Sequence, residues 1–228
     1  MTISYTKLLF AFVLFAPVFM YAQSNSTGYL ETEVALGYAV APTYSHNFSI
    51  SQRSFLHRNG EYEFTTRQLD ITHFSKLKIS PRNSIALGLQ YRFRDIFNKD
   101  EGNEFRITEQ FNTTIKHNSV RYGHRLRAEQ RLRTDNNAYR FRYRLALDTP
   151  LQGAELNDNE FFLVLSTESL LSVAAKRSAV YDQRITSQLG FLTKHQITYS
   201  IGAEYRMEDY THTTQHNWFI TANMDISL

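Results

Sequence analysis

The segment AYRFRYRLALDT, residues 138–149, alternates between apolar and polar side chains. One set of alternate positions holds Tyr139, Phe141, Tyr143, Leu145 and Leu147, and the other holds Arg140, Arg142, Arg144, Ala146 and Asp148. Successive side chains of a strand point to opposite faces, whereas a helix would spread these apolar residues around its whole circumference. The segment is therefore predicted to be a β-strand with one apolar face and one arginine-rich face.

The same alternation recurs along the chain and marks eleven segments. They are expected at residues 29–41, 43–54, 65–79, 84–96, 103–117, 119–134, 138–149, 160–173, 180–193, 196–207 and 214–227. Many exceed the usual five or six residues of strands in soluble proteins and suit tilted strands that cross a bilayer. Because single-chain bacterial barrels have even strand numbers, one strand near the N-terminus is expected to be miscounted. The predicted fold is thus an all-β, antiparallel up-and-down transmembrane barrel of about ten or twelve strands.

The connections between these segments alternate in length. Tight turns are expected at 41–42, 80–83, 117–119 and 194–195, and longer connections at 55–64, 97–102 and 208–213. Outer-membrane barrels have short periplasmic turns and long outer loops, so the tight turns are assigned to the periplasm. The connection 150–159 breaks the rule, because it is long yet falls on the periplasmic side.

A soluble β-sandwich in the periplasm is the alternative to this barrel. A sandwich turns its apolar faces inward, whereas a membrane barrel turns them outward. The long strands, the alternating connections and the guanidinium groups beside carboxylates on the polar faces favour the barrel.

The N-terminal residues resemble a secretory signal peptide. Lys7 supplies a positive charge, residues 8–20 are almost entirely apolar, and Ala22 offers a small residue for cleavage. The apolar run is short for a membrane-spanning helix. Residues 1–22 are therefore expected to be a signal peptide and 23–228 an outer-membrane barrel of a Gram-negative bacterium, with a buried N-terminal helix as the alternative.

Composition limits the chemistry of the chain. It has no cysteine, which excludes disulfides and thiolate metal sites, and no cofactor or metal is expected. Without Lys7 the charges nearly balance, with 24 basic against 22 acidic residues, which argues against a polyanion-binding surface. The expected partners are outer-membrane lipids and, during biogenesis, the barrel assembly machinery; no nucleic acid is expected, and the sequence does not define an oligomeric state.

The polar faces carry an unusual number of arginines. Arginine accounts for 18 of the 25 basic residues, and nine of these lie between Arg106 and Arg144. Unpaired charge inside a narrow barrel is costly, so each arginine is expected to meet a carboxylate. The predicted ion-pair network of the barrel lumen comprises Arg92, Arg94, Glu104, Arg106, Arg121, Arg125, Arg127, Glu129, Arg131, Arg140, Arg142, Arg144, Glu168, Asp182, Arg184, Glu204 and Arg206. A cationic constriction that selects anions, and a catalytic or lipid-headgroup site, remain as alternatives.

Glu109 does not fit the alternation. It is in phase with Phe105, Ile107 and Phe111, which should face lipid, where a charge is expensive. A β-bulge between Ile107 and Phe111 is expected to turn Glu109 inward, and a position near an interface is the alternative.

No catalytic residue is assigned from the sequence. The chain lacks a Gly-x-Ser-x-Gly elbow, and spacing alone places no serine or aspartate beside a histidine. His212 and His216 have i, i+4 spacing, which suits zinc on a helix but not on a strand. The candidate bases are His73, His117, His124, His195, His212 and His216.

Several short segments resemble the family known as domain of unknown function 2490. They are Asn103–Arg106, Glu109-Gln110, His124-Arg125, Glu129–Arg131, Arg140–Leu145 and Pro150-Leu151. The resemblance covers most of the mature chain and is most specific over residues 103–151. It implies a secreted protein that looks like an outer-membrane barrel, and it implies no activity. The last residue, Leu228, departs from the aromatic ending that is common in outer-membrane proteins.

Three functions follow from these features. The favoured one is a small outer-membrane barrel closed by its own arginine–glutamate pairs, acting as a structural or loop-mediated interaction protein. Small barrels are usually filled by side chains, which supports it. The alternative is a narrow channel for small polar or anionic solutes, and the third is an outer-membrane lipid-modifying hydrolase.

Overall fold

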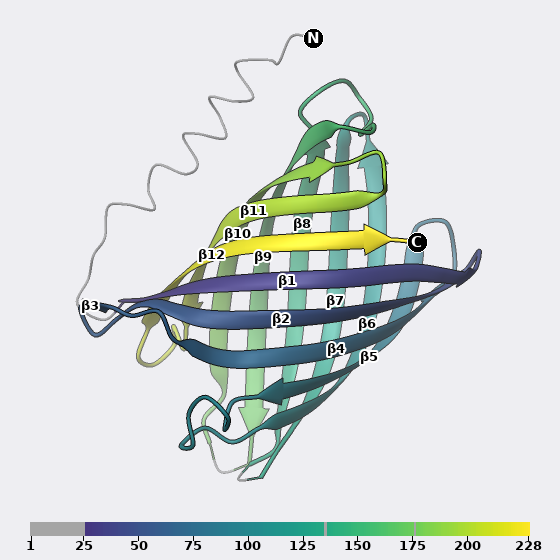
Figure 1. The fold of residues 1–228 in the computed structure, drawn as a ribbon. Coiled ribbons are helices and arrows are strands. Elements are labelled where there is room, and N and C mark those ends of the chain that lie inside the picture. Colours follow the sequence, from purple (N-terminus) through teal and green to yellow (C-terminus); the bar gives the residue numbers. More distant parts are fainter. Residues whose placement is uncertain (1–25, 135, 176) are drawn as a thin grey trace.

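A computed structural model describes residues 26–134, 136–175 and 177–228 of the 228-residue chain. The expected signal peptide lies outside the described residues. All regular structure in the described part is β-strand (Figure 1). The strands are β1 (Ser26–Ala41), β2 (Tyr44–Arg58), β3 (Glu61–Tyr62), β4 (Thr66–Lys78), β5 (Asn83–Phe93), β6 (Glu104–His117), β7 (Val120–Arg133), β8 (Ala138–Pro150), β9 (Glu160–Ala174), β10 (Val180–Leu192), β11 (Ile197–Glu208) and β12 (Gln215–Ser227). Each of the eleven segments expected from the alternation is confirmed, with ends that differ by a few residues.

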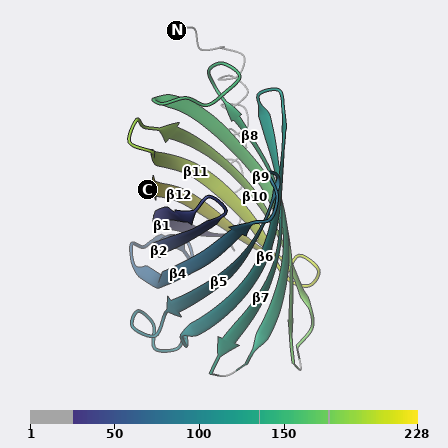
Figure 2. The ribbon, with the colours of Figure 1, turned by 90° about the vertical axis from the view of Figure 1, so that its right-hand side faces the viewer.

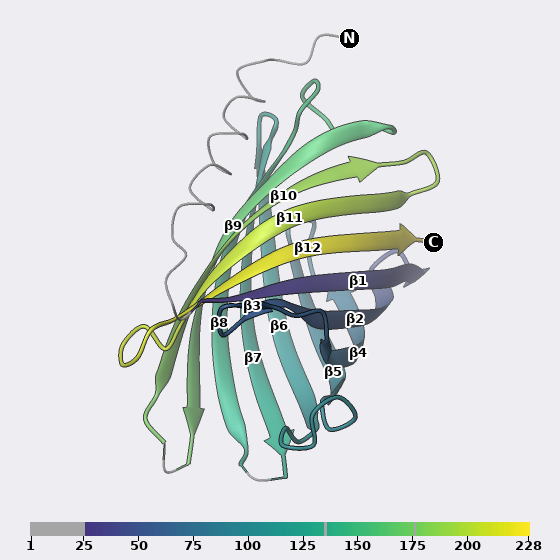
Figure 3. The ribbon, with the colours of Figure 1, turned by 60° about the vertical axis from the view of Figure 1, so that its left-hand side comes forward.

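The strands form one sheet that closes on itself. Neighbours in sequence pair antiparallel from β1 round to β12, and β1 then pairs with β12 in parallel (Figure 3). The two-residue β3 only extends the edge of β2, so the wall of the barrel has eleven strands. The expectation of ten or twelve strands is therefore wrong. An odd number of alternating strands makes the first and last run in the same direction, which is why the closing pair is parallel.

The two mouths of the barrel differ. At one mouth, here called the turn mouth, the connections are 42–43, 79–82, 118–119, 151–159 and 193–196. The other, the loop mouth, carries the β2–β4 connection with β3, together with residues 94–103, 134–137, 175–179 and 209–214. As expected, the long connection 151–159 shares the mouth with the tight turns. The β2–β3 hairpin turns at Asn59 and Gly60, whose positive φ angles of 55° and 87° match the preferred two-residue hairpin.

The barrel turns its apolar side chains outward. Each of the eleven wall strands has an exposed large apolar or aromatic residue: Val34, Ile50, Ile71, Leu87, Phe105, Leu126, Phe141, Phe161, Ile185, Ile201 and Ile220. Among the described residues sixteen polar or charged side chains are buried, but only five hydrophobic ones. A soluble protein would reverse this ratio. The strong twist and tilt of the strands are visible from the side (Figure 2).

One small apolar cluster lies inside. Tyr29, Phe55 and Phe219 are buried together, and the rings of Tyr29 and Phe219 stack with centroids 4.7 Å apart. Phe55 faces inward because it continues the inward alternation of Ser51 and Arg53 along β2 and is the ladder partner of Tyr29. In the described part of the chain no helix is long and apolar enough to cross a membrane.

Candidate functional site in the barrel interior

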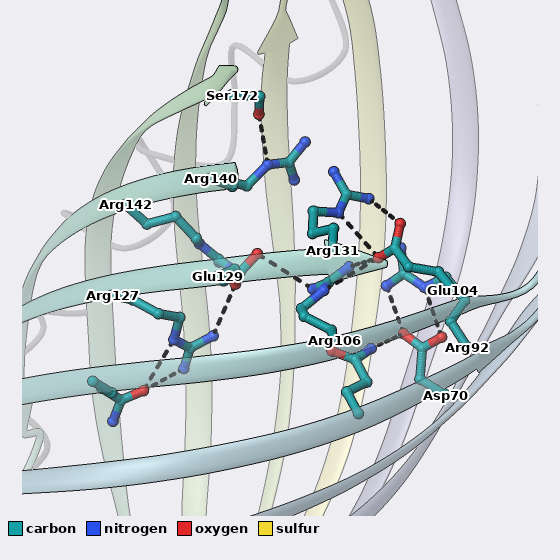
Figure 4. A network of polar contacts seen from close by, with 12 residues as sticks. Asp70, Arg92, Glu104, Arg106, Arg127, Glu129, Arg131, Arg140, Arg142 and Ser172 are labelled. Atoms are coloured by element: carbon teal, nitrogen blue, oxygen red, sulfur yellow. Dashed lines mark hydrogen bonds and ion pairs between the residues drawn. The ribbon is translucent and has the colours of Figure 1, made fainter. Parts of the chain in front are cut away.

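Glu104 is the centre of the interior charge network. Its side chain projects from the start of β6 and the residue is only 1% exposed. Two guanidinium groups shown in Figure 4 lie next to it, those of Arg106 at 2.5 Å and Arg131 at 2.9 Å, and a third, that of Arg133, lies at 2.5 Å. Arg94 lies at 3.8 Å. Glu104 is paired directly with Arg133 in the β6–β7 ladder, so this cluster follows from the register of the two strands.

A second chain of ion pairs continues from Glu129 across β8 to β9. One nitrogen of Arg142 lies 2.7 Å from Glu129 and another lies 2.6 Å from Glu168. Arg106 links this chain to Glu104, because its Nη1 lies 3.5 Å from Glu129. Arg184 of β10 reaches Glu168 at 3.8 Å. The pairs therefore cross five neighbouring strands, β6 to β10, without a break.

The remaining strands carry a third group of pairs. Arg92 binds both carboxylate oxygens of Asp70, with nitrogen–oxygen distances of 2.8 and 2.6 Å. Glu31 meets Arg53 at 2.5 Å and Arg206 at 3.8 Å. Arg206 also pairs with Glu204 and stacks over Phe219, with the guanidinium carbon 3.6 Å from the ring centroid. Such bidentate and stacked geometry suits arginine and not lysine. We call the three groups together the ion-pair belt.

The structure does not give every predicted residue a carboxylate partner. Arg121 pairs with Asp148 at 2.8 Å but lies apart, near the turn mouth. Arg127 donates to Gln110 and lies 3.8 Å from Glu129. Arg140 donates to Ser172 at 2.7 Å and is 3.9 Å from Asp182. The expectation that each arginine meets a carboxylate is wrong for Arg125 and Arg144, which have no ion pair within the described residues. Arg125 donates to Asn112 at 3.1 Å.

Four members of the belt were absent from the predicted network: Glu31, Arg53, Asp70 and Arg133. The alternation itself contained the signal, since Asp70 follows Gln68 and precedes Thr72 on the face opposite Leu69 and Ile71. The signal is weaker in β1, β2 and β4 because their inward faces carry only one or two charges each, whereas those of β7 and β8 carry several arginines.

The bulge expected at Glu109 is wrong. β6 pairs with β5 and β7 without a register shift, and Glu109 lies directly between Leu87 and Ala128. Its side chain is exposed and keeps the outward phase of Phe105, Ile107 and Phe111. With no extra residue to reset the alternation, the carboxylate stays on the apolar outer face.

Replacing Glu109 with leucine is expected to stabilise the barrel in lipid vesicles by about 1–2 kcal/mol. The gain comes from removing the charge. A basic side chain that faces lipid lowers the stability of a membrane barrel by ~2–4 kcal/mol, and an acidic one lowers it by somewhat less. The measurement is urea unfolding of vesicle-inserted protein, followed by gel mobility. Glu61→Leu in the exposed β3 hairpin is the control and should not raise the midpoint. A loss of stability in Glu109→Leu would contradict the outward orientation.

The interior is not completely filled. A cavity of about 1400 Å³ runs inside the barrel and is bordered by residues of both mouths. Ala138, Ala174 and Ser178 border it near the loop mouth, and Ala39 and Ser227 border it near the turn mouth. Most of its lining is polar, and many of the belt residues contribute to it.

The histidines do not form a nucleophilic triad. Ser75 and His73 on the outer face of β4 both lie near His46 of β2, at 3.2 and 3.0 Å. Both contacts involve the same nitrogen, Nδ1 of His46, whereas proton relay needs one imidazole nitrogen for each partner. His212 contacts Asp209 at 2.8 Å in the loop between β11 and β12. Within the described residues no three His, Asp or Glu side chains gather as they would around a metal ion.

The fold and the interior define an eleven-stranded β-barrel with an apolar outer face and a charged inner one. The chain belongs to the DUF2490 family, described as a protein of unknown function, whose sequence profile matches residues 32–217. No curated protein and no solved structure matches the chain. The family assignment supplies no activity.

Proposed function

We propose that this protein is an outer-membrane barrel of a Gram-negative bacterium and provides a narrow passage for small polar solutes. The apolar girdle on all eleven wall strands supports placement in a bilayer, because exposed apolar surface of this extent is otherwise found at interfaces. The signal-peptide pattern of residues 1–22 supports export. With this placement the turn mouth faces the periplasm and the loop mouth faces outward.

The observation that carries the passage is the interior cavity of about 1400 Å³, which borders both mouths. A barrel sealed by its side chains would have separate small voids in place of one continuous space. The polar lining favours hydrated solutes, and many residues of the ion-pair belt contribute to that lining. The passage is thus the channel considered above as the alternative to a closed barrel.

The second candidate is a closed barrel that acts through its loops. The belt favours it, since Glu104 and Glu129 are each only 1% exposed and tie several strands together. In that case the outer loops, and not the interior, would carry the activity.

Conductance of the mature chain in planar bilayers tests the passage. We expect small, steady conductance from protein refolded in detergent. Arg142→Ala, which opens the belt between Glu129 and Glu168, should raise the conductance per barrel and also lower stability. Tyr62→Ala in the exposed β3 is the control and should change neither. Silence from barrels shown to be folded would overturn the passage and favour the closed barrel.

A further inference from the structure

Two small groups of charge on the inward faces of the barrel wall have no ion pair among the described residues. Arg125 and Arg144 form the basic wall; they are direct partners in the β7–β8 ladder, a like-charge arrangement that costs stability. The Nε atom of Arg144 is buried with no hydrogen-bond partner among the described residues. Glu33 and Asp225 form the acidic wall. Neither has an ion pair in the described part of the chain, and Glu33 only accepts a 3.4 Å hydrogen bond from Ser49.

The strand register places the two walls across from each other. Stepping across the ladder from Glu33 through β2, β4, β5 and β6 leads to Arg133 of β7. Stepping the other way through β12, β11, β10 and β9 leads to Pro150 of β8, which is level with residue 119 before β7. The two routes end at different heights on β7, at Arg133 and before its start at residue 119, because the strands of a closed barrel tilt. The part of β7 that is level with Glu33 lies about midway between these two ends. Glu33 therefore faces the midpoint of this stretch, at residues 125–127 of β7 and 142–144 of β8.

The space between the walls is open. Glu33, Arg125 and Arg144 all border the same interior cavity. Next to the basic wall the ladder pairs Gly123 with Ala146, and these small side chains leave room toward the turn mouth. Asp225 lies on the same inward phase of β12 as Asn223, the ladder partner of Glu33, and is exposed near the turn mouth. Small polar side chains such as Ser49 and Thr221 lie beside the acidic wall.

Unpaired charges of opposite sign on facing walls produce an electric field across the passage. Unpaired charges inside a barrel lower its stability, through desolvation and through repulsion between like charges. Ionisable groups that are kept inside a membrane-spanning structure at this cost indicate a site for a solute. A zwitterion can turn its carboxylate toward one wall and its ammonium toward the other. A simple anion or cation is attracted by one wall and repelled by the other.

We propose that the passage selects small zwitterionic solutes, oriented with the carboxylate toward Arg125 and Arg144 and the ammonium toward Glu33 and Asp225. This inference rests on the proposed passage and names its solute class. It differs from an anion-selective constriction, which would need a basic ring without the acidic wall.

Swelling of proteoliposomes in three solutes of similar size tests this selection. The probes are alanine as zwitterion, lactamide as uncharged solute and lactate as anion. We expect alanine to enter about tenfold faster than lactamide, at the low end of the enrichment that charged clefts achieve. Glu33→Gln with Asp225→Asn should remove this preference and favour lactate. Arg125→Gln with Arg144→Gln should remove the preference and disfavour lactate.

The outcomes separate the two proposals. Equal entry of alanine and lactamide would overturn the zwitterion selection and leave the passage intact. Entry of none of the three into vesicles that hold folded barrels would overturn the passage and the selection together. Glu33→Gln alone covers the risk of misfolding, because the amide oxygen can still accept the one hydrogen bond that Glu33 receives, from the Ser49 hydroxyl. If this folded variant kept the full alanine preference, Glu33 would have no role in the selection, and the acidic wall as proposed would be overturned.

Discussion

Glu104→Gln is expected to lower the free energy of unfolding by about 3–5 kcal/mol, the usual cost of breaking a buried ion pair from one side. The exchange preserves the shape of the side chain but removes the charge that Arg106, Arg131 and Arg133 share. Three guanidinium groups would then face each other inside the barrel with one amide oxygen between them. Urea unfolding in detergent micelles, followed by Trp218 fluorescence and by gel mobility, measures the loss.

Glu155→Gln is the matched control for this exchange. Glu155 also pairs with a basic residue, Lys116 at 3.0 Å, but its side chain is 77% exposed. Exposed pairs contribute about 0–1 kcal/mol, so this variant should unfold almost as the original protein does. Equal stability of the two variants would show that the belt around Glu104 does not hold the barrel together.

Ile201→Arg is expected to cost about 2–4 kcal/mol when the barrel is inserted in lipid vesicles, the penalty of a basic residue at the midplane of a bilayer. Ile201 lies near the middle of β11 with its side chain outward and 63% exposed. In detergent micelles, which adapt to a charged side chain, the cost should be smaller. The measurement is the fraction of folded protein at increasing urea in each medium.

Tyr62→Arg supplies the comparison, because Tyr62 is 93% exposed in β3 beyond the wall of the barrel. Its stability should be the same in vesicles and in micelles. If Ile201→Arg also behaved the same in both, the outer face would not be in contact with hydrocarbon and the outer-membrane proposal would fail.

The strands could be predicted because their signal is local. Alternation with period two marks all eleven wall strands. Even β4, whose inward face carries only Asp70 and Lys76, is located within a residue or so. The direct count of eleven segments gives the correct strand number, whereas the even-number rule for bacterial barrels gives ten or twelve. The prediction that Glu109 turns inward is wrong for a similar reason. The cost of an outward charge favours a bulge, but the unbroken alternation of β6 places Glu109 outward.

The partners within the network could not be predicted, because they depend on register. The sequence places Glu104 on an inward face. It does not show that Arg133 is its ladder partner on β7, or that Arg131 is the next inward residue of that strand. The position of the basic wall opposite the acidic wall depends on the register of all the strands between them. Glu33 and Arg125 are far apart in the sequence, and only the tilt of the whole barrel brings them to the same level.

The parallel pairing of β1 with β12 has a topological consequence. Ser26 begins β1 at the loop mouth, whereas Ser227 ends β12 at the turn mouth. In a barrel with an even strand number both ends would meet at one rim. Here a linker that joined them in a circular permutant would have to span the full height of the wall. In the proposed outer-membrane placement, reporters fused before Ser26 and after Ser227 would lie on opposite sides of the membrane.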